Sequence, residues 1–294
     1  MNRDRRRFLK QSACVGGLLM LDPAAALNSP LAQERTMMDA RRMRLKTAEP
    51  QLDIDSVLVF DDFEEEDWAA YWGDAFEDRN TRVRTTEPAH VFRGLAACEE
   101  RHQEGSHNPF DLQQRFQGHD EVYLRWYTML DEGYEVDRGV KMSGLAARDD
   151  TRPYKGAGIR PNGKDKFSCR LTLHRDWTPV FYTYHMDQLG RYGDILEQNV
   201  GTPVKLETMR WYCLEMMLKA NSAPKADGEL KLWIDGDLKG HYDCIRFRDV
   251  NTLRADRCSL SAYFGGSWSS PKDQRRWVDD YVVASAYVGP TQEH

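Results

Sequence analysis

The sequence lacks the signatures of several large protein classes. No apolar run approaches the roughly 20 residues that a membrane-spanning helix needs. Neither a G-x-G-x-x-G pattern nor a phosphate-binding loop occurs, and we expect no cofactor. The six cysteines include no C-x-x-C pair, which argues against a zinc site or a thioredoxin-like centre. They form no disulfide framework, although a single bridge between Cys244 and Cys258 stays open.

An overall basic charge is also missing. The 294 residues carry a net charge of −6. The first 26 residues hold five basic and two acidic side chains, a net charge of +3, so the remainder is near −9. This balance argues against nonspecific binding to nucleic acid or to an anionic membrane. If the ligand is an acidic polymer, a local basic cleft must attract it.

The N-terminus is typical of a twin-arginine export signal. Arg5-Arg6-Arg7-Phe8-Leu9-Lys10 precedes a short apolar stretch, and Ala24-Ala25-Ala26 offers a cleavage site. We predict a signal peptide over residues 1–26, the twin-arginine translocase as a partner during export, and a periplasmic or secreted protein without a membrane anchor. The alternative is a basic N-terminus that stays in the cytoplasm. Residues 27–51 are polar and are interpreted as a linker or a short helix.

The remaining sequence alternates in the manner of β-strands. Hydrophobic residues make up 40% of the chain and aromatic residues 11%, enough for a substantial core. No helix longer than two or three turns is expected, and Trp68–Trp72 is a candidate for a short one. We predict an all-β fold, one antiparallel β-sandwich over residues 52–290. The predicted strands are Ser56–Phe60, Glu121–Leu130, Ser168–His174, Val180–His185, Arg210–Lys219, Glu229–Ile234, Cys258–Phe264 and Trp277–Ala286, with a hairpin turn at Asp235-Gly236.

Polar residues with a period of two stand out on two of these strands. Ser168 and Arg170 share one face of their strand, and Tyr182 and Tyr184 share one face of the next. Lys141 lies upstream in Gly139-Val140-Lys141-Met142-Ser143-Gly144-Leu145, which is interpreted as a glycine-flanked loop. Each feature alone is common on sheet surfaces and in loops. Their combination indicates a cleft that carries cations and phenols.

The combined pattern resembles polysaccharide lyase family 14. Lys-x-x-Gly-Leu, then Ser-x-Arg, then Tyr-x-Tyr twelve residues after that arginine are found here at Lys141, Ser168, Arg170, Tyr182 and Tyr184. The resemblance covers roughly residues 53–290 and implies a concanavalin A-like jelly roll that cleaves alginate or glucuronan. The stretch between Lys141 and Ser168 is longer than is usual in the family, which bears on substrate choice.

The chemistry of such a lyase explains the residue types. A polysaccharide lyase removes the weakly acidic proton next to a uronate carboxylate and expels the 4-linked sugar. Lys141 and Arg170 would neutralise the carboxylate and stabilise the enolate, for which a guanidinium is well shaped. Tyr184 or Tyr182 would transfer the proton, with its pKa lowered by the two cations. Ser168 would orient the sugar or the leaving oxygen.

Two further sets of polar residues were weighed. Glu100-Arg101-His102-Gln103 and Ser106-His107-Asn108 are interpreted as a polar loop, from which Arg101 and His107 could bind the acidic polysaccharide. Asp61-Asp62 and Asp279-Asp280 could hold a structural Ca²⁺, although capping of strands and turns is the more common role.

Two other classes of protein compete with a lyase. A glycoside hydrolase on the same fold would need a pair of catalytic carboxylates, and the Glu-x-Asp-x-x-Glu strand motif is absent. A non-catalytic carbohydrate-binding or adhesion module would need stacking aromatics but no cluster of cations with tyrosines. It is favoured if Lys141, Arg170 and Tyr184 lie farther apart than one sugar ring can bridge.

Overall fold

The structure, a computed structural model, describes residues 30–73, 75–77, 82–107, 110–153 and 156–291. The predicted signal peptide, residues 1–26, lies outside the described residues. The chain divides into two compact units, residues 1–40 and 41–294. The described part of the first unit is the beginning of helix α2, Pro30–Ala48. None of the described helices is long and apolar enough to cross a membrane.

Helix α2 has 19 residues, so the expectation of no helix beyond two or three turns is wrong. Its end, from Arg41 onward, belongs to the second unit. Leu45 there is fully buried in a small apolar cluster with Val57 and Phe60. The sequence indicated at most a short helix here, because the buried face of α2 in the second unit rests on so few apolar residues.

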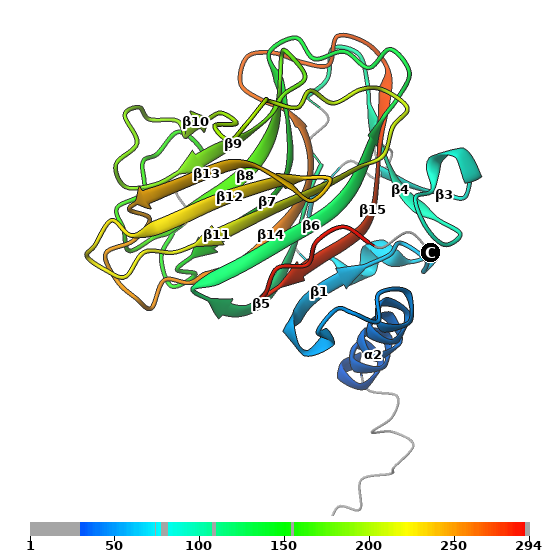
Figure 1. Cartoon of the computed structure of the whole chain (residues 1–294), viewed down its shortest axis with the longest axis horizontal. Coiled ribbons are helices and arrows are strands. Elements are labelled where there is room, and N and C mark those ends of the chain that lie inside the picture. Colours follow the sequence, from blue (N-terminus) through cyan, green and yellow to red (C-terminus); the bar gives the residue numbers. More distant parts are fainter. Residues whose placement is uncertain (1–29, 74, 78–81, 108–109, 154–155, 292–294) are drawn as a thin grey trace, which may run out of the picture. The chain divides into compact units, whose positions relative to one another are not determined.

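The second unit contains two stacked antiparallel sheets (Figure 1). The first sheet has the strand order β13-β12-β11-β6-β15-β4-β3, and β1 pairs with β15. Its strands are β1 Val57–Asp61, β3 Arg82–Thr85, β4 Ala97–His102, β6 Glu121–Leu130, β11 Tyr212–Lys219, β12 Gly228–Ile234, β13 Asp237–Ile245 and β15 Gln274–Ala284. Within the described residues, short 3-10 helices lie at Ile54–Ser56, Trp68–Tyr71 and Pro88–His90.

The second sheet has the strand order β10-β9-β8-β7-β14-β5-β2. Its strands are β2 Ala75–Glu77, β5 Phe110–His119, β7 Gly139–Arg148, β8 Lys166–His174, β9 Pro179–Tyr184, β10 Asp194–Leu196 and β14 Ala255–Phe264. The prediction of an all-β sandwich is confirmed. All eight predicted strands occur, and the turn at Asp235-Gly236 joins β12 to β13.

One apolar core fills the space between the sheets. Alternate residues of β8 supply it, because Phe167, Cys169 and Leu171 are buried while Ser168 and Arg170 remain partly exposed. The same alternation on the neighbouring strands leaves a polar outer face on the second sheet. That outer face carries the candidate site.

The structure answers the question of the disulfide. Within the described chain all five cysteines are free, with Cys258 buried and Cys244 exposed. No bridge joins the two, so that possibility is excluded here. The fold is held by its core and by hydrogen-bonded strands.

Candidate active site

Three neighbouring strands, β7, β8 and β9, carry the predicted catalytic residues on one face. In the pairing of β8 with β9, Ser168 lies opposite Tyr184 and Arg170 lies opposite Tyr182. Residues that face each other across an antiparallel pair project to the same side of the sheet. Lys141 is placed in the adjoining strand β7, so its interpretation as a loop residue was wrong. A register irregularity lies between Lys141 and Gly144 in the β7–β8 pairing.

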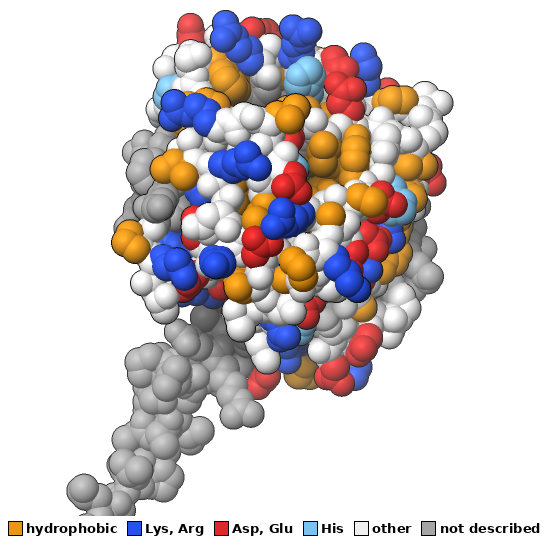
Figure 2. Space-filling view, turned by 90° about the vertical axis from the view of Figure 1, so that its left-hand side faces the viewer, with side chains coloured by type: hydrophobic (Ala, Val, Ile, Leu, Met, Phe, Trp, Pro, Cys, Tyr) orange, Lys and Arg blue, Asp and Glu red, His pale blue; other side chains and the backbone are white. Residues whose placement is uncertain are grey.

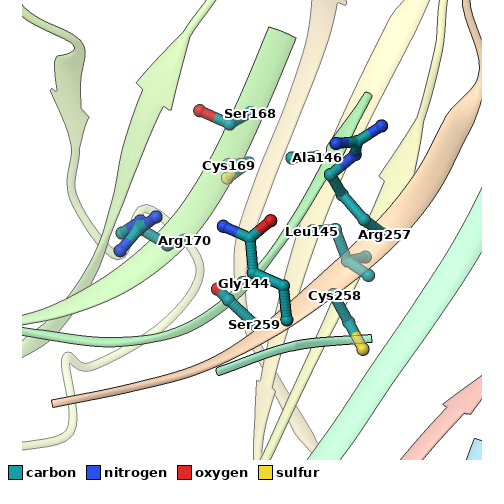
Figure 3. A pocket seen from close by; sticks show the side chains of 10 residues that line it. Gly144, Leu145, Ala146, Ser168, Cys169, Arg170, Arg257, Cys258 and Ser259 are labelled. Atoms are coloured by element: carbon teal, nitrogen blue, oxygen red, sulfur yellow. The ribbon is translucent and has the colours of Figure 1, made fainter. Parts of the chain in front are cut away.

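The five residues line a single pocket with a volume of about 380 Å³. It connects with a small hollow that Figure 3 shows from close by, where Ser168 and Arg170 project from β8 on one side and Arg257 from β14 on the other. Gly144 and Ala146 of β7 lie between these two strands. Lys141, Arg170 and Tyr184 therefore meet in one cavity, as a catalytic site requires.

Lys141 is packed among aromatic rings at one end of the pocket. Its Nζ lies 5.2 Å from the centroid of the Tyr182 ring and 4.9 Å from that of Tyr263. Burial lowers the pKa of Lys141 to about 8, and repulsion by Arg170 adds to the lowering, while Asp111 opposes it. An appreciable fraction of Lys141 is therefore neutral in mildly alkaline solution, and this form can accept a proton.

Arg170 is held from two sides. Its Nη1 donates to Ser261 Oγ at 3.1 Å, and its Nη2 lies 3.6 Å from Asp111 Oδ2. The side chain remains 22% exposed, so part of the guanidinium still faces the pocket. A fixed and permanently charged guanidinium is suited to bind a carboxylate.

The two tyrosines are coupled through their hydroxyl groups, which lie 3.2 Å apart. The backbone N–H of Gly158 donates to Tyr184 Oη at 3.1 Å. Burial raises the pKa of Tyr182, and the hydrogen bond with Tyr184 raises it further. The expectation that two cations lower the tyrosine pKa is thus wrong for Tyr182, because burial outweighs the charge of Arg170. Tyr182 stays protonated and can donate to Tyr184 Oη.

The structure separates the two predicted substrate-binding residues. His107 is exposed, and its ring lies 5.9 Å from that of Tyr263, which in turn contacts Lys141. His107 is not among the residues that line the pocket, and its relation to Lys141 is indirect, through Tyr263. Arg101 lies instead on β4 in the other sheet, where its Nε donates to Glu99 at 2.7 Å. The loop interpretation was wrong for Glu100–His102, which belong to β4, whereas Gln103, Ser106 and His107 lie outside any strand or helix as expected. Asn108 lies outside the described residues.

Sequence reasoning missed several residues of the pocket, namely Asp111, Gln113, Arg148, Lys166 and Arg257. Two of them continue period-two patterns that the sequence shows. Lys166 extends the series of Ser168 and Arg170, and Arg257 begins the series Ser259, Ser261 and Tyr263 on β14. Lys166 Nζ donates to Gly156 O at 2.6 Å and lies 5.7 Å from the Tyr184 ring centroid.

The two acidic pairs that could bind Ca²⁺, Asp61-Asp62 and Asp279-Asp280, form hydrogen bonds or ion pairs with other groups of the protein. Asp61 accepts from Trp72 Nε1 at 2.7 Å, and Asp62 accepts from Arg44 Nε at 2.6 Å. Asp279 Oδ2 accepts from two backbone N–H groups of the segment before β4, and Asp280 pairs with Arg93 at 2.7 Å. Across the described residues, no three His, Cys, Asp or Glu side chains are grouped as metal ligands. Of these contacts, those of Asp279 cap backbone N–H groups, and the other three are ion pairs or hydrogen bonds between side chains.

Charge elsewhere on the surface is mixed. On the face shown in Figure 2, Lys and Arg side chains lie among Asp, Glu and apolar side chains, without one continuous basic patch. The attraction of an acidic ligand therefore depends on the cations of the pocket rather than on this face.

Comparison with solved structures identifies the fold. The chain resembles alginate lyase vAL-1 from a Chlorella virus, with a TM-score of 0.62 and 18% identity over 78% of this chain and 99% of that one. For a variant of alginate lyase Aly36B in complex with alginate tetrasaccharide, the TM-score is 0.59 and the identity 16%, over 80% of this chain and 95% of that one. For endo-β-1,4-glucuronan lyase from the fungus Trichoderma reesei, the TM-score is 0.50 and the identity 16%, over 73% of this chain and 91% of that one.

These similarities define the fold as that of the jelly-roll polysaccharide lyases. The family description "Polysaccharide lyase 14" matches residues 89–281, about two thirds of the chain. The protein belongs to polysaccharide lyase family 14. A comparison with curated protein sequences gives no match.

Proposed function

We propose that this protein cleaves a polymer of 4-linked uronate residues, of the alginate or glucuronan type, by β-elimination. The observation that carries the proposal is the meeting of Lys141, Arg170 and Tyr184 in one pocket of about 380 Å³. Elimination needs an anchor for the carboxylate, a base for the neighbouring proton and an acid for the leaving oxygen. The three side chains have the chemistry for these roles.

Arg170 anchors the carboxylate of the uronate that loses its proton. Hydrogen bonds from the guanidinium draw charge away from the carboxylate, which makes the proton next to it more acidic. The contacts with Ser261 and Asp111 fix the guanidinium before the substrate arrives. Little rearrangement is then needed in the transition state.

Lys141 removes the proton. Its pKa of about 8 leaves a useful fraction of neutral amine near neutral pH, whereas an ordinary lysine would be almost fully charged. After the transfer, the ammonium group lies next to the enolate and stabilises its negative charge. The base at the start of the step thus becomes a counter-charge at its end.

Tyr184 protonates the leaving oxygen. Donation leaves a phenolate, and two donors lie beside its oxygen: the Gly158 N–H at 3.1 Å and the Tyr182 hydroxyl at 3.2 Å. Hydrogen bonds to the charged form stabilise it, so Tyr184 is the better acid of the two tyrosines. Ser168, opposite Tyr184 on β8, is close enough to orient the same sugar.

The alternative function, that of a non-catalytic carbohydrate-binding module, is less well supported than that of a lyase. Such a module would bind sugar rings on exposed aromatic side chains; Trp126 is only 1% exposed, whereas Trp177, Trp233 and Trp268 are partly exposed, so the aromatic residues alone do not separate the two functions. A binding module would, however, have no use for a lysine whose pKa is lowered by burial next to an arginine. A hydrolase remains disfavoured by the lack of its carboxylate motif.

Ultraviolet absorbance tests the proposal, because elimination creates an unsaturated uronate end. The purified domain would be incubated with alginate, polymannuronate, polyguluronate and glucuronan. Rising absorbance with one of them supports the proposal and names the polymer. No change with any of them, together with retained binding, would identify a binding module instead.

Export remains a proposal that rests on the N-terminal sequence alone. Replacing Arg5 and Arg6 by Lys should keep the protein in the cytoplasm, as cell fractionation would reveal. Unchanged export of this variant would exclude the twin-arginine route.

A further inference from the structure

Two polar side chains of the first sheet cross the apolar core and end on the second sheet. Arg276 of β15 donates from Nη2 to the carbonyl oxygen of Ser261 at 2.8 Å. Tyr281 of the same strand donates from its hydroxyl group to the carbonyl oxygen of Ser259 at 3.0 Å. Both side chains are fully buried, and both acceptors belong to β14. We call Arg276 and Tyr281 the core brace.

The charge of Arg276 is balanced inside the core. Glu100, opposite Arg276 on the neighbouring strand β4, forms an ion pair with it. A buried ion pair adds little to stability, because the loss of hydration offsets the attraction between the charges. Two apolar side chains could fill the same space. The pair is therefore better explained by the contact of Arg276 with β14 than by the stability that it provides.

The core brace contacts β14 where this strand departs from regular pairing. The register of β14 with β7 shifts between Ser259 and Tyr263. Such an irregularity interrupts the ladder of backbone hydrogen bonds, so the neighbouring strand holds this stretch less firmly. The two side-chain donors bind the backbone within the same stretch. Its position therefore depends on the first sheet.

The irregular stretch of β14 supports both catalytic cations. Ser261 Oγ accepts from Arg170 Nη1 at 3.1 Å. Asp111, opposite Ser261 on β5, lies 3.6 Å from Arg170 Nη2. Tyr263 is opposite Lys141, whose Nζ lies 4.9 Å from the centroid of the Tyr263 ring. A shift of this stretch would therefore move the groups that hold Arg170 and enclose Lys141.

We propose that the core brace positions Arg170 and Lys141 for catalysis through the backbone of β14. Arg276 and Tyr281 are positioning residues, since neither is among the residues that line the catalytic pocket. The inference rests on the proposed function and adds to it two residues of the other sheet. The catalytic face of the second sheet thus depends on side chains that the substrate does not contact.

Tyr281→Phe removes one contact of the core brace with little change in volume. Tyr212→Phe is the matched control, because Tyr212 is also buried on the first sheet and its hydroxyl accepts from Glu207 N at 3.0 Å. We expect kcat/KM to fall about tenfold in Tyr281→Phe, less than the effect of a full 1 Å displacement. Tyr212→Phe should keep the wild-type value.

A second variant replaces the buried pair as a unit, Arg276→Met with Glu100→Leu, so that no unpaired charge is left in the core. Its control is Arg125→Met with Glu49→Leu, which removes another buried ion pair of 2.8 Å. Thermal unfolding gives the stability that each replacement costs. Below both unfolding temperatures, kcat/KM should fall by about 100-fold in the brace variant and stay near the wild-type value in the control.

Titration of Lys141, followed by NMR of its labelled side chain, provides a readout that needs no turnover. Burial, with repulsion by Arg170, lowers the pKa of Lys141 to about 8. When Arg170 and Tyr263 are held less firmly, this pKa should rise toward the ordinary value of lysine, in both brace variants and in neither control.

Wild-type kcat/KM and an unchanged Lys141 pKa in the brace variants would overturn the proposal. Equal losses in the controls would also overturn it, because they would show a general effect of destabilisation. Absence of cleavage by the wild-type protein would instead overturn the proposed function, and the titration of Lys141 would still test the core brace. The two failures are therefore distinguishable.

Discussion

Gly144 of β7 lies directly opposite Arg170 of β8, and a Cβ on Gly144 would be 2.4 Å from the Cβ of Arg170. It would also be 2.6 Å from the carbonyl oxygen of Cys169. No real Cβ tolerates such distances, so the backbone or the arginine would have to move. The glycine of the Lys-x-x-Gly-Leu pattern is thus explained by the space that Arg170 needs.

Gly144→Ala should therefore lower kcat/KM by about 100-fold, because a shift of about 1 Å in a positioning group has effects of that size. The measurement is the initial rate of formation of unsaturated product. Gly190→Ala is the control, since its Cβ would meet no atom closer than 3.8 Å, and it should retain activity. Full activity of Gly144→Ala would show that Arg170 does not need its present position.

Removal of single hydroxyl groups should distinguish the role of Tyr184 from that of Tyr182. Tyr184→Phe should lower kcat by about 10²–10⁴-fold, the usual effect of losing a general acid. Tyr182→Phe should have a smaller effect, because Tyr184 would keep its hydrogen bond from Gly158 N. Both variants should unfold at nearly the temperature of wild type by circular dichroism. A larger loss in Tyr182→Phe would reverse the two roles.

The dependence of activity on pH should report Lys141. A base with a pKa of about 8 is mostly protonated below that value, so kcat/KM should rise with pH and level off above about 8. If Lys141 served only as a cation, kcat/KM would fall through the same range. The pH–rate profile of the wild-type protein therefore decides between base and counter-charge.

Stability should depend on pH through buried carboxyl groups. Burial is the largest cause that raises the pKa of Asp61 and Asp280 to about 6 and of Glu100 and Glu215 to about 7. A raised folded-state pKa stabilises the fold below the unfolded pKa, and this contribution is lost as pH rises through the folded value. The contribution of these groups to the free energy of unfolding should therefore fall between about pH 4 and 7.

Glu215→Gln should reduce that fall by about 1 kcal/mol, because the amide does not ionise. Its oxygen can still accept one of the backbone hydrogen bonds that Glu215 accepts from Val288 and Gly289. Glu87→Gln at an exposed position should leave the pH dependence unchanged. Denaturant unfolding at several pH values gives the result, and an unfolding free energy that does not fall across this range would refute the argument.

The features that were predicted correctly from the sequence are those that depend on the alternation of side chains along a strand. Ser168 with Arg170 and Tyr182 with Tyr184 each show a period of two, and the register of β8 with β9 brings the pairs together as expected. Strand β7 was missed because Gly139, Ser143 and Gly144 interrupt its pattern, although Lys141 depends on it. A strand that is central in its sheet needs little local propensity of its own.

Other parts of the site depend on contacts between distant segments. Nothing local indicates that Gly158 would donate to Tyr184, or that Arg115, Arg148 and Arg257 would surround Asp150. Gly156 and Gly158 belong to the stretch between Lys141 and Ser168, which lies far from Tyr184 in the sequence. Arg101 illustrates the opposite error, a polar residue in a segment mistaken for a loop.

The mass of the cleavage products tests β-elimination most directly. Elimination yields a new non-reducing end that is lighter by one water than the end left by hydrolysis. Mass spectrometry of products from a uronate polymer should show this unsaturated series with wild type, and far less of it with Tyr184→Phe after the same time. Products with saturated ends only would contradict the account, since they would mean that Lys141 and Tyr184 serve another reaction.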